Sequence, residues 1–510
     1  MKKTMNIVNF VRGIEPRREM DLYTPVAEQI KYNKKYAIPN TFLLQYDAMR
    51  RRDFRDLFLR ERDDNMELGV WLENCRELIE TIGLQWRGRE GYDWDWFVNV
   101  GFLQGYTPRQ REMIVDEVFR LFKEIFGEYP QVVGSWVMDA HSMDYMCGKY
   151  NIKAFCICRE QLAVDAYTLW GGYSNGGYYP SKNNMICPAQ TEENKIPAPV
   201  FRMLMSDPIY NYDGKKYDKS DEPIFATIEP GWESGQDPAL ADWYFDMYYK
   251  TPCLTHVEAT TGQENSFGWH MFGDGYCMQI DKLVALEKEG FVSLQKLGDT
   301  GVWYQENFPV SAATAQVVLE DWRGNDLKTV WYNCKNYRAN FLLVGDTLLV
   351  RDLTKYDDRY PERYLEVPCE GWLATYDNLP IVDSCVWSQE GKDCELRFAK
   401  GVAAVDVSED SDTVLRLKLT FTDGTFGAVV LSEESMTFEN CGDLSYSWGV
   451  PTEYTSLAFE GNCLKGSQNG FAYEMPVDGI VVPGEDGFVL RPENSKLRLK
   501  LDRRILREGT

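Results

Sequence analysis

Residues 132–142 read Val132-Val133-Gly134-Ser135-Trp136-Val137-Met138-Asp139-Ala140-His141-Ser142, an apolar run that ends in an aromatic ring, a carboxylate and an imidazole. A helical pattern at Thr107–Phe126 and a turn, Gly127-Glu128-Tyr129-Pro130, come before it. A helix, a turn and then a buried strand form the repeating unit of a parallel β/α fold. Because such folds place their chemistry where strands end, the end of this strand is the first candidate for a functional site.

Apolar runs alternate with helical patterns over about the first 290 residues, as a parallel β/α fold requires. The clearest helix begins at Thr107-Pro108, which provides an N-cap and a proline in the first turn. The sequence therefore predicts an α/β domain over residues 1–298. Its expected strands lie at residues 6–11, 41–46, 67–72, 132–137, 153–157, 201–205, 225–228 and 254–257.

The pattern changes near Asp299. From there, short strand-like runs are separated by turn signals such as Asp423-Gly424 and Gly484-Glu485-Asp486-Gly487. Several runs alternate with a period of two residues, which indicates strands that bury one face. We predict an all-β region over residues 299–510, built from one or two sandwich-like modules.

The composition narrows the possible partners. The chain has 510 residues, enough for two or three domains, and its net charge of −24 argues against nucleic acid and anionic membranes. No apolar run approaches the roughly 20 residues that span a bilayer. Arg12 and Glu15 interrupt the N-terminal apolar stretch too early for a signal peptide, and the thirteen cysteines show no paired spacing. These features predict a cytoplasmic protein with reduced thiols, and they leave the oligomeric state open.

Asp139 is the first candidate for catalysis. It ends the quoted strand, with Trp136 before it and His141 after it, and both neighbours are expected to contact the substrate. The alternative is structural, because an aspartate here can cap the helix that begins near Ser142.

Other carboxylates follow other expected strands. Glu264 lies in a polar loop that begins with glycine, Glu229 precedes a Pro230-Gly231 turn, and Glu258 follows the last apolar run. These three join Asp139 as candidate catalytic residues. Three more strand-end acids are expected to bind substrate: Glu15, Asp47 and Glu73. For Asp47 and Glu73, helix capping or ion pairing is as good an explanation as a functional role.

Aromatic residues make up 14% of the chain, and many lie beside glycine, asparagine and aspartate rather than inside apolar runs. Rings in such loops are typical of surfaces that stack against sugars, and bracing of long loops is the alternative. We expect the walls of the sugar subsites to be formed by Trp71, Trp136, Trp232 and Trp269.

Metal chemistry finds little support in the sequence. It contains three histidines, His141, His256 and His270, in no His-x-Asp or His-x-x-x-His pattern. A catalytic zinc usually takes two or three histidines, or histidine together with carboxylate. We therefore expect neither a metal nor a cofactor.

The N-terminal half resembles the glycoside hydrolase/deacetylase superfamily of (β/α)7 barrels. The helix through Phe126, the Gly127-x-x-Pro130 turn and the strand leading to Asp139 are similar to the polysaccharide-deacetylase pattern. Trp136-x-x-Asp139-Ala140-His141-Ser142 is similar to the Trp-x-x-Asp-Pro-Phe-Gly-His-Ser motif of class II α-mannosidases, whose aspartate is the nucleophile and a zinc ligand. The resemblance covers residues 5–290 and implies a (β/α)7-type barrel, to which an all-β C-terminal region is commonly attached.

The sequence departs from both patterns where they bind metal. The strand at 67–72 contains no histidine, and the first strand runs into Arg12-Gly13-Ile14-Glu15. The resemblance is then closer to the family-57 amylases, whose carboxylates lie on strands four and seven. It implies Asp139 as nucleophile or base and Glu258 or Glu264 as general acid, while the residues alone leave Glu229 open as well.

We predict a glycoside hydrolase that acts on an oligosaccharide through paired carboxylates, without a metal. Two alternatives stay open. One is a metal-dependent carbohydrate deacetylase on the same barrel, and the other is a non-catalytic glycan-binding protein that keeps the cleft.

Overall fold

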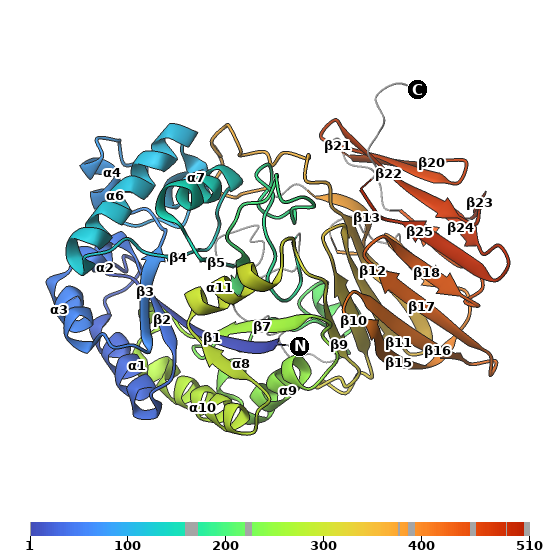
Figure 1. Cartoon of the computed structure of the whole chain (residues 1–510), viewed down its shortest axis with the longest axis horizontal. Coiled ribbons are helices and arrows are strands. Elements are labelled where there is room, and N and C mark those ends of the chain that lie inside the picture. Colours follow the sequence, from blue (N-terminus) through green and yellow to red (C-terminus); the bar gives the residue numbers. More distant parts are fainter. Residues whose placement is uncertain are drawn as a thin grey trace.

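The computed structural model describes residues 2–158, 172–203, 205–219, 227–375, 378–385, 393–448, 455–485 and 487–503. It consists of a helix-covered parallel barrel in the N-terminal half and a stack of antiparallel sheets in the C-terminal half (Figure 1). The expected strand at residues 225–228 lies largely outside the described residues.

Seven parallel strands form a nearly closed barrel in the order β6-β5-β4-β3-β2-β1-β7, and β8 pairs with β1. The predicted (β/α)7-type barrel is confirmed. Among the described residues, β6 and β7 share no ladder, so the barrel stays open there. The strands are β1 (Lys2–Val11), β2 (Asn40–Leu44), β3 (Met66–Trp71), β4 (Val132–Ser135), β5 (Ala154–Cys158), β6 (Val200–Met203), β7 (His256–Thr261) and β8 (Ser293–Gln295).

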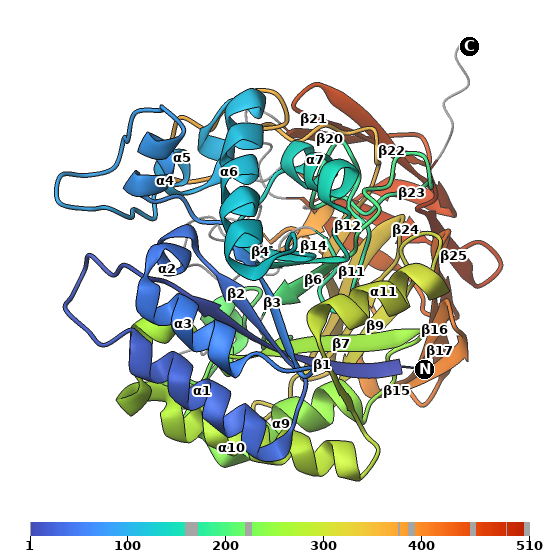
Figure 2. The same cartoon turned by 60° about the vertical axis from the view of Figure 1, so that its left-hand side comes forward.

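Helices cover the outside of the barrel, and Figure 2 shows α1, α3 and α10 along one side of it. In the part of the chain that the structure describes, no helix is long and apolar enough to cross a membrane. The α-helices are α1 (Tyr23–Tyr36), α2 (Tyr46–Arg50), α3 (Arg52–Glu61), α4 (Arg76–Thr81), α5 (Val98–Gly101), α6 (Pro108–Phe126), α7 (Ala140–Tyr150), α8 (Glu233–Gln236), α9 (Pro238–Tyr249), α10 (Trp269–Lys288) and α11 (Leu297–Asn307).

The alternation of β1 decides which side chains point into the barrel. Met5 and Ile7 pack in the cluster that contains the helix residues Leu240 and Phe272, whereas Phe10 packs in the cluster that fills the barrel. Because successive side chains of a strand point to opposite faces, Arg12 continues the inward row immediately after the strand ends.

Helix α6 begins and ends as its sequence predicts. Thr107 and Gln110 form a capping box, Pro108 occupies the first turn, and Gly127 ends the helix with a left-handed φ of 85°. This helix lies beside α7, which follows β4 and begins at Ala140.

Two antiparallel sheets form the C-terminal region and share one apolar core, as in a sandwich. The predicted all-β region is confirmed from Thr314 onward, whereas α11 extends past the expected boundary at residues 298/299. One sheet contains β9 (Thr314–Val318), β10 (Lys328–Asn333), β11 (Tyr337–Val344), β12 (Thr347–Lys355), β13 (Leu379–Asp383), β14 (Glu395–Phe398), β19 (Leu444–Ser447), β23 (Ile480–Pro483) and β24 (Gly487–Arg491). The other contains β15 (Val402–Ser411), β16 (Val414–Phe421), β17 (Phe426–Ser432), β18 (Ser435–Glu439), β20 (Thr455–Glu460), β21 (Cys463–Gln468), β22 (Phe471–Asp478) and β25 (Lys496–Lys500).

One connection of the sandwich reaches back to the barrel. The return segment, residues 356–375, follows β12 and runs across to the end of the barrel near α5 and α6 (Figure 2). Backbone hydrogen bonds fix it there: Val98 N–H donates to the Trp372 carbonyl at 3.0 Å, and Cys369 N–H donates to the Gln104 carbonyl at 2.6 Å. The rim of the barrel is therefore built from both halves of the chain.

Candidate active site

Four neighbouring strands of the barrel, β7, β1, β2 and β3, bring carboxylates to one buried arginine. Arg12 directly follows β1, Asp47 lies just beyond β2, Glu73 just beyond β3 and Glu264 just beyond β7. The carboxyl ends of parallel strands meet at the same end of a barrel, which is why residues so far apart in sequence converge here. We call Arg12, Glu15, Asp47, Glu73 and Glu264 the Arg12 cluster.

The guanidinium group of Arg12 holds two glutamates at one of its nitrogens. Glu73 Oε2 lies 3.4 Å from Arg12 Nη2, and Glu264 Oε2 lies 3.2 Å from the same atom. Since both oxygens lie within 3.4 Å of one nitrogen, they are less than about 7 Å apart. Paired carboxyl groups that hydrolyse glycosides are spaced about 5–9.5 Å apart, and this upper limit falls within that range.

Among the carboxyl groups of the Arg12 cluster, Glu73 has the pKa that is raised furthest above its ordinary value. Burial raises the pKa of Glu73 to about 7, while Arg12 and the hydrogen bond from Trp71 Nε1 act in the opposite direction. The nearby carboxylates of Glu264 and Asp47 add to the rise. At neutral pH, Glu73 is therefore divided between its acid and carboxylate forms.

The other two carboxylates of the cluster are committed to local contacts. Asp47 accepts hydrogen bonds from Gly13 N–H at 3.0 Å and Ala48 N–H at 2.8 Å, and burial raises its pKa to about 6. Glu15 pairs with Arg17 at 2.6 Å and lies 3.7 Å from Arg12. Burial acts to raise the pKa of Glu15, but the hydrogen bonds and charges of the two arginines lower it overall.

The cluster retains hydrogen-bonding capacity that the surrounding protein does not use. Among the described residues, Arg12 Nε and Nη1, Glu264 Oε2 and Trp94 Nε1 are buried without a hydrogen-bond partner. These atoms adjoin one another, since the Arg12 guanidinium lies 4.1 Å from the Trp94 ring centre and pairs with Glu264. Buried polar atoms are nearly always satisfied, so donors and an acceptor left over together indicate a place for a polar ligand.

Glu229 lies next to this cluster. Its carboxylate accepts a hydrogen bond from Gln263 Nε2 at 2.6 Å, and Gln263 is the chain neighbour of Glu264. Trp232 Nε1 donates to the other carboxylate oxygen at 2.9 Å, and the Trp232 side chain is 51% exposed. Glu229 and Trp232 therefore extend the site from the cluster towards the surface.

The four predicted tryptophans fall into two groups. Trp71 and Trp136 are buried in the barrel, where Trp71 stacks on Phe10 at 4.2 Å and Trp136 meets both rings edge to face. Trp269 is half-buried at the start of α10 and packs on neighbouring helix residues. Of the four, Trp232 alone exposes more than a third of its surface.

The structure corrects the position of Glu258. The apolar pattern suggested that the strand ends just before it, but β7 runs from His256 to Thr261 and Glu258 is its third residue. Val257 and Ala259 pack towards the helices, so Glu258 points into the barrel, where it accepts a hydrogen bond from Thr260 Oγ1 at 3.1 Å. It lies within the barrel wall and not at the rim, and its catalytic role stays a prediction.

Asp139 is the N-cap of α7 and the partner of a second buried arginine. Its Oδ1 accepts from Ser142 N–H and from Arg111 Nη1, both at 2.9 Å, and its Oδ2 accepts from Ser142 Oγ at 2.8 Å. The residue is completely buried beneath the return segment, and Glu362 of that segment accepts from Ala140 N–H at 2.8 Å. The geometry shows capping and ion pairing, and a catalytic role for Asp139 stays a prediction.

The histidines do not provide the ligands of a metal-dependent deacetylase. His141 faces Glu112 of α6 at 3.2 Å, His270 lies in the first turn of α10, and His256 is buried at the start of β7. Burial lowers the pKa of His256 to about 3, with the charge of Lys2 acting in the same direction. Within the described ranges, no group of three or more histidine, cysteine, aspartate or glutamate side chains is arranged to hold a metal ion. The residues present therefore do not fit the metal that such an activity requires.

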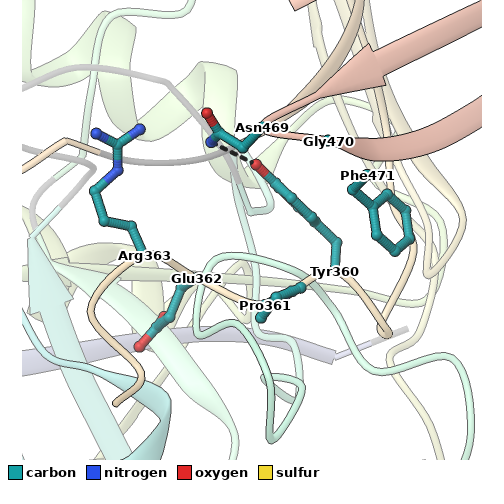
Figure 3. Close-up of a pocket in the computed structure, with 7 residues that line it drawn as sticks. All are labelled: Tyr360, Pro361, Glu362, Arg363, Asn469, Gly470 and Phe471. Atoms are coloured by element: carbon teal, nitrogen blue, oxygen red, sulfur yellow. Dashed lines mark hydrogen bonds between the residues drawn. The ribbon is translucent and has the colours of Figure 1, made fainter. Parts of the chain in front are cut away.

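A pocket of about 560 Å³ lies elsewhere, where the return segment leaves the sandwich (Figure 3). Asn469 donates a hydrogen bond to the Tyr360 hydroxyl at 3.0 Å, while the Glu362 side chain points away from both. With one carboxylate in its lining, this pocket does not offer the paired acids of the Arg12 cluster. It is lined by Tyr360, Pro361, Glu362, Arg363, Asn469, Gly470 and Phe471.

Comparison with solved structures defines the class of fold. A Parabacteroides distasonis protein assigned as a glycoside hydrolase/deacetylase superimposes with a TM-score of 0.53 at 15% identity, covering 75% of this chain and 89% of the other. The fold of this chain is thus similar to that of the Parabacteroides distasonis protein, with a parallel α/β barrel followed here by a β-rich region. No protein-family model and no curated protein matches the sequence.

Two further structures are less similar. A Mycobacterium smegmatis protein assigned as a polysaccharide deacetylase has a TM-score of 0.35 at 12% identity, covering 61% of this chain and 93% of its own. An α-amylase from Thermotoga maritima has a TM-score of 0.32 at 8% identity, covering 59% and 74%. At these scores the likenesses carry no argument about the activity of this chain.

Three residues of the site, Arg12, Trp94 and Gln263, were not predicted as site residues. Arg12 offers one signal, because a charged residue that continues the inward row of an apolar strand must find partners at the barrel end. Trp94 is flanked by Asp93 and Asp95, as expected of rings that stack on sugars, and Gln263 lies in the polar loop of Glu264. Only the fold, however, brings these two side chains to the carboxylates.

Proposed function

We propose that this protein is a carbohydrate-active hydrolase that cleaves a glycosidic bond with Glu73 and Glu264 as its paired carboxylates. The observation that carries the proposal is the sharing of one Arg12 nitrogen by two buried glutamates, one of them with a pKa raised to about 7. A carboxyl group with a raised pKa beside a second carboxyl group provides the working parts of a glycosidase.

Glu73 is the general acid. In its protonated form it gives its proton to the oxygen of the leaving sugar, and Arg12, 3.4 Å away, stabilises the carboxylate that results. Gln45 Nε2 and Trp71 Nε1 hold the Glu73 carboxyl group at 2.7 and 2.9 Å, which fixes the direction of the proton. Such catalysis contributes about 10²- to 10⁴-fold to the rate.

Glu264 is the nucleophile or the general base. Its Oε2 lies 3.2 Å from Arg12 Nη2 and makes no hydrogen bond among the described residues, so this oxygen can still accept one from a substrate. The carboxylate attacks the anomeric carbon or takes a proton from the attacking water. Glu229 and the exposed Trp232 support the sugar beside it.

The chemistry of the donor set favours glycoside hydrolysis over deacetylation. The similar protein from Parabacteroides distasonis is assigned to both activities, so it does not distinguish them. Deacetylation on this barrel depends on a histidine-containing metal site, which the described residues do not provide. Paired carboxylates around an arginine need no metal to act on an acetal carbon.

The test is a panel of aryl α- and β-glycosides, neutral oligosaccharides and acetylated sugars, assayed with and without a chelator. Turnover of a glycoside that survives the chelator and is lost in Glu264→Gln supports the proposal. Glu124→Gln serves as the matched control, because this glutamate is exposed on α6 and, among the described residues, forms an ion pair with Arg120 alone. Metal-dependent release of acetate, or binding of sugar without any turnover, would contradict it.

A further inference from the structure

One tryptophan on the return segment is exposed far more than its size leads one to expect. The Trp372 side chain is 58% exposed, and Val367 and Leu373 of the same segment are 57% and 37% exposed. A group of large apolar side chains that is exposed on the surface and surrounded by polar residues often marks a binding site. Here the surround includes Glu366 and Glu370.

Trp372 begins a row of rings that leads to the Arg12 cluster. Its ring centre lies 5.8 Å from that of Phe97, which lies 6.1 Å from Trp96. Trp96 lies 5.8 Å from Trp94, and the Trp94 ring faces the Arg12 guanidinium at 4.1 Å. The most exposed ring of the rim is thus connected, contact by contact, to the paired carboxylates.

The row is held rigidly. Arg89 lies over Trp96 and Phe97 at 3.9 and 4.7 Å, and Asp95 fixes its guanidinium group with two hydrogen bonds at 2.9 and 3.0 Å. The backbone of Trp372 is tied to Val98 N–H at 3.0 Å. Binding energy gained at Trp372 is therefore not spent on ordering a loose loop.

We propose that Trp372 is the outer platform of an extended substrate site that takes a neutral oligosaccharide or polysaccharide chain. This inference rests on the proposed function, because the inner end of the row is the carboxylate pair. A sugar ring offers an apolar C–H face to an aromatic ring and hydroxyl groups to polar neighbours, which is the combination found around Trp372. Residues 364–375 contain no lysine or arginine, and the chain carries a net charge of −24, so an acidic polysaccharide is disfavoured.

The expected consequence is a dependence on chain length. A sugar bound at Trp372 is remote from the bond that breaks, so it favours long substrates and leaves short ones unaffected. In Trp372→Ala, kcat/KM on a long neutral chain is expected to fall about tenfold, mainly through KM, with an unchanged value on an aryl monoglycoside. Trp372→Phe keeps a ring and should recover most of the loss.

The experiment compares wild type, Trp372→Ala, Trp372→Phe and Phe426→Ala on aryl monoglycosides and on graded oligosaccharides of the sugar that is cleaved. Phe426 is the matched control, since it is 71% exposed on β17 of the sandwich. Equal losses on short and long substrates, or no loss on either, would overturn the inference. So would light scattering that shows a dimer broken by Trp372→Ala, because the patch would then join two copies.

A second readout keeps the inference testable if the proposed function fails. Should wild type cleave no glycoside, the same four proteins are run through native gels that contain soluble starch, xylan, galactomannan or polygalacturonate. Retardation by a neutral polysaccharide that disappears in Trp372→Ala supports the platform without any catalysis. Retardation by polygalacturonate alone, equal retardation of wild type and Trp372→Ala, or none at all overturns it.

Discussion

Arg12 and Arg111 are both buried arginines that face carboxylates at the same end of the barrel, yet their hydrogen bonds differ completely. Arg111 donates to Asp139 and to five backbone carbonyls, those of Leu103, Tyr106, Tyr364, Leu365 and Val367. The Arg12 guanidinium group makes one hydrogen bond within the described residues, to Glu73 at 3.4 Å, and its Nε and Nη1 make none.

This difference distinguishes an arginine that stabilises the fold from one that has donors left for a ligand. A guanidinium group saturated by backbone carbonyls holds segments together, and Arg111 in this way ties the return segment to α6 and α7. A buried guanidinium group with unused donors is costly unless something else completes it, and in the proposed function a substrate with many hydroxyl groups does so. Strand-end acids alone do not indicate a substrate site, whereas the unused donors of their partner favour the one proposed at Arg12.

The largest effect is expected from the carboxylates of the Arg12 cluster. Glu73→Gln and Glu264→Gln should each lower kcat on the cleaved glycoside about 10²- to 10⁴-fold, because each removes a group that moves a proton or attacks carbon. Steady-state kinetics and circular dichroism on the same preparations check the loss and the fold. An activity within a few-fold of wild type for either variant would remove that residue from catalysis.

The next effect is on stability, and here substitution of Arg111 should cost more than substitution of Arg12. Arg111→Met is expected to lower the free energy of unfolding by about 3–5 kcal/mol, because Asp139 and several carbonyls lose a buried partner. Arg12→Met gives up one hydrogen bond and the ion pairs with Glu73 and Glu264, yet it should cost less, about 1–2 kcal/mol, because it leaves no backbone carbonyl unpaired and Glu73 can take up a proton. Urea unfolding followed by tryptophan fluorescence measures both. Equal losses would show that Arg12 too is a structural link.

The raised pKa of Glu73 predicts how stability changes with pH. The folded protein keeps this proton up to about pH 7, whereas an unfolded chain releases it near 4.5, so the stabilisation is present at low pH and is lost as the pH rises to about 7. The total is on the order of 3 kcal/mol. Unfolding free energies of wild type and Glu73→Gln from pH 4 to 8 should differ by an amount that changes over this window. A constant difference would show that Glu73 titrates normally.

The same proton sets the pH dependence of the rate. If, as proposed, the acid form of Glu73 protonates the leaving group, kcat/KM should fall about tenfold per pH unit above about pH 7. A rate profile measured on an aryl glycoside with a good leaving group serves as the control, since it needs less protonation and should fall less steeply.

The smallest effect is expected at Asp139. Asparagine can still cap α7, and five carbonyls still hold Arg111, so Asp139→Asn should cost about 1–2 kcal/mol of stability and leave kcat within about twofold. Activity and melting temperature measured together decide the matter. A loss of activity as large as that of Glu264→Gln would move catalysis to the Arg111 region, as the resemblance to the mannosidase motif implies.

Much of the architecture follows from local patterns. The period of two residues along β1, the capping box of Thr107 and the glycine that ends α6 each act over a few residues, and the predicted elements formed accordingly. Several short strands of the sandwich, such as β13 and β23, were not predicted, because four or five residues carry too weak a period.

Local sequence patterns predicted only part of the candidate site. Glu73 and Glu264 were selected because they follow strands, but their pairing depends on Arg12, which lies 61 and 252 positions away from them in the sequence. Asp139 looked stronger than either, because Trp136 and His141 stand beside it in the chain. Its partners are Ser142, three positions along the chain, and Arg111 of α6, while Glu362 of the return segment binds its neighbour Ala140.

Backbone periodicity and capping thus specified the parallel barrel, its helices and the β-rich half, since hydrogen bonding and burial of this kind depend on near neighbours. Which acids share a cation, which arginine is saturated and which tryptophan stays exposed depend on contacts between segments hundreds of residues apart. The burial that raises the pKa of Glu73 and the contacts that seal Asp139 exist only once the barrel closes and the sandwich returns a segment to its rim.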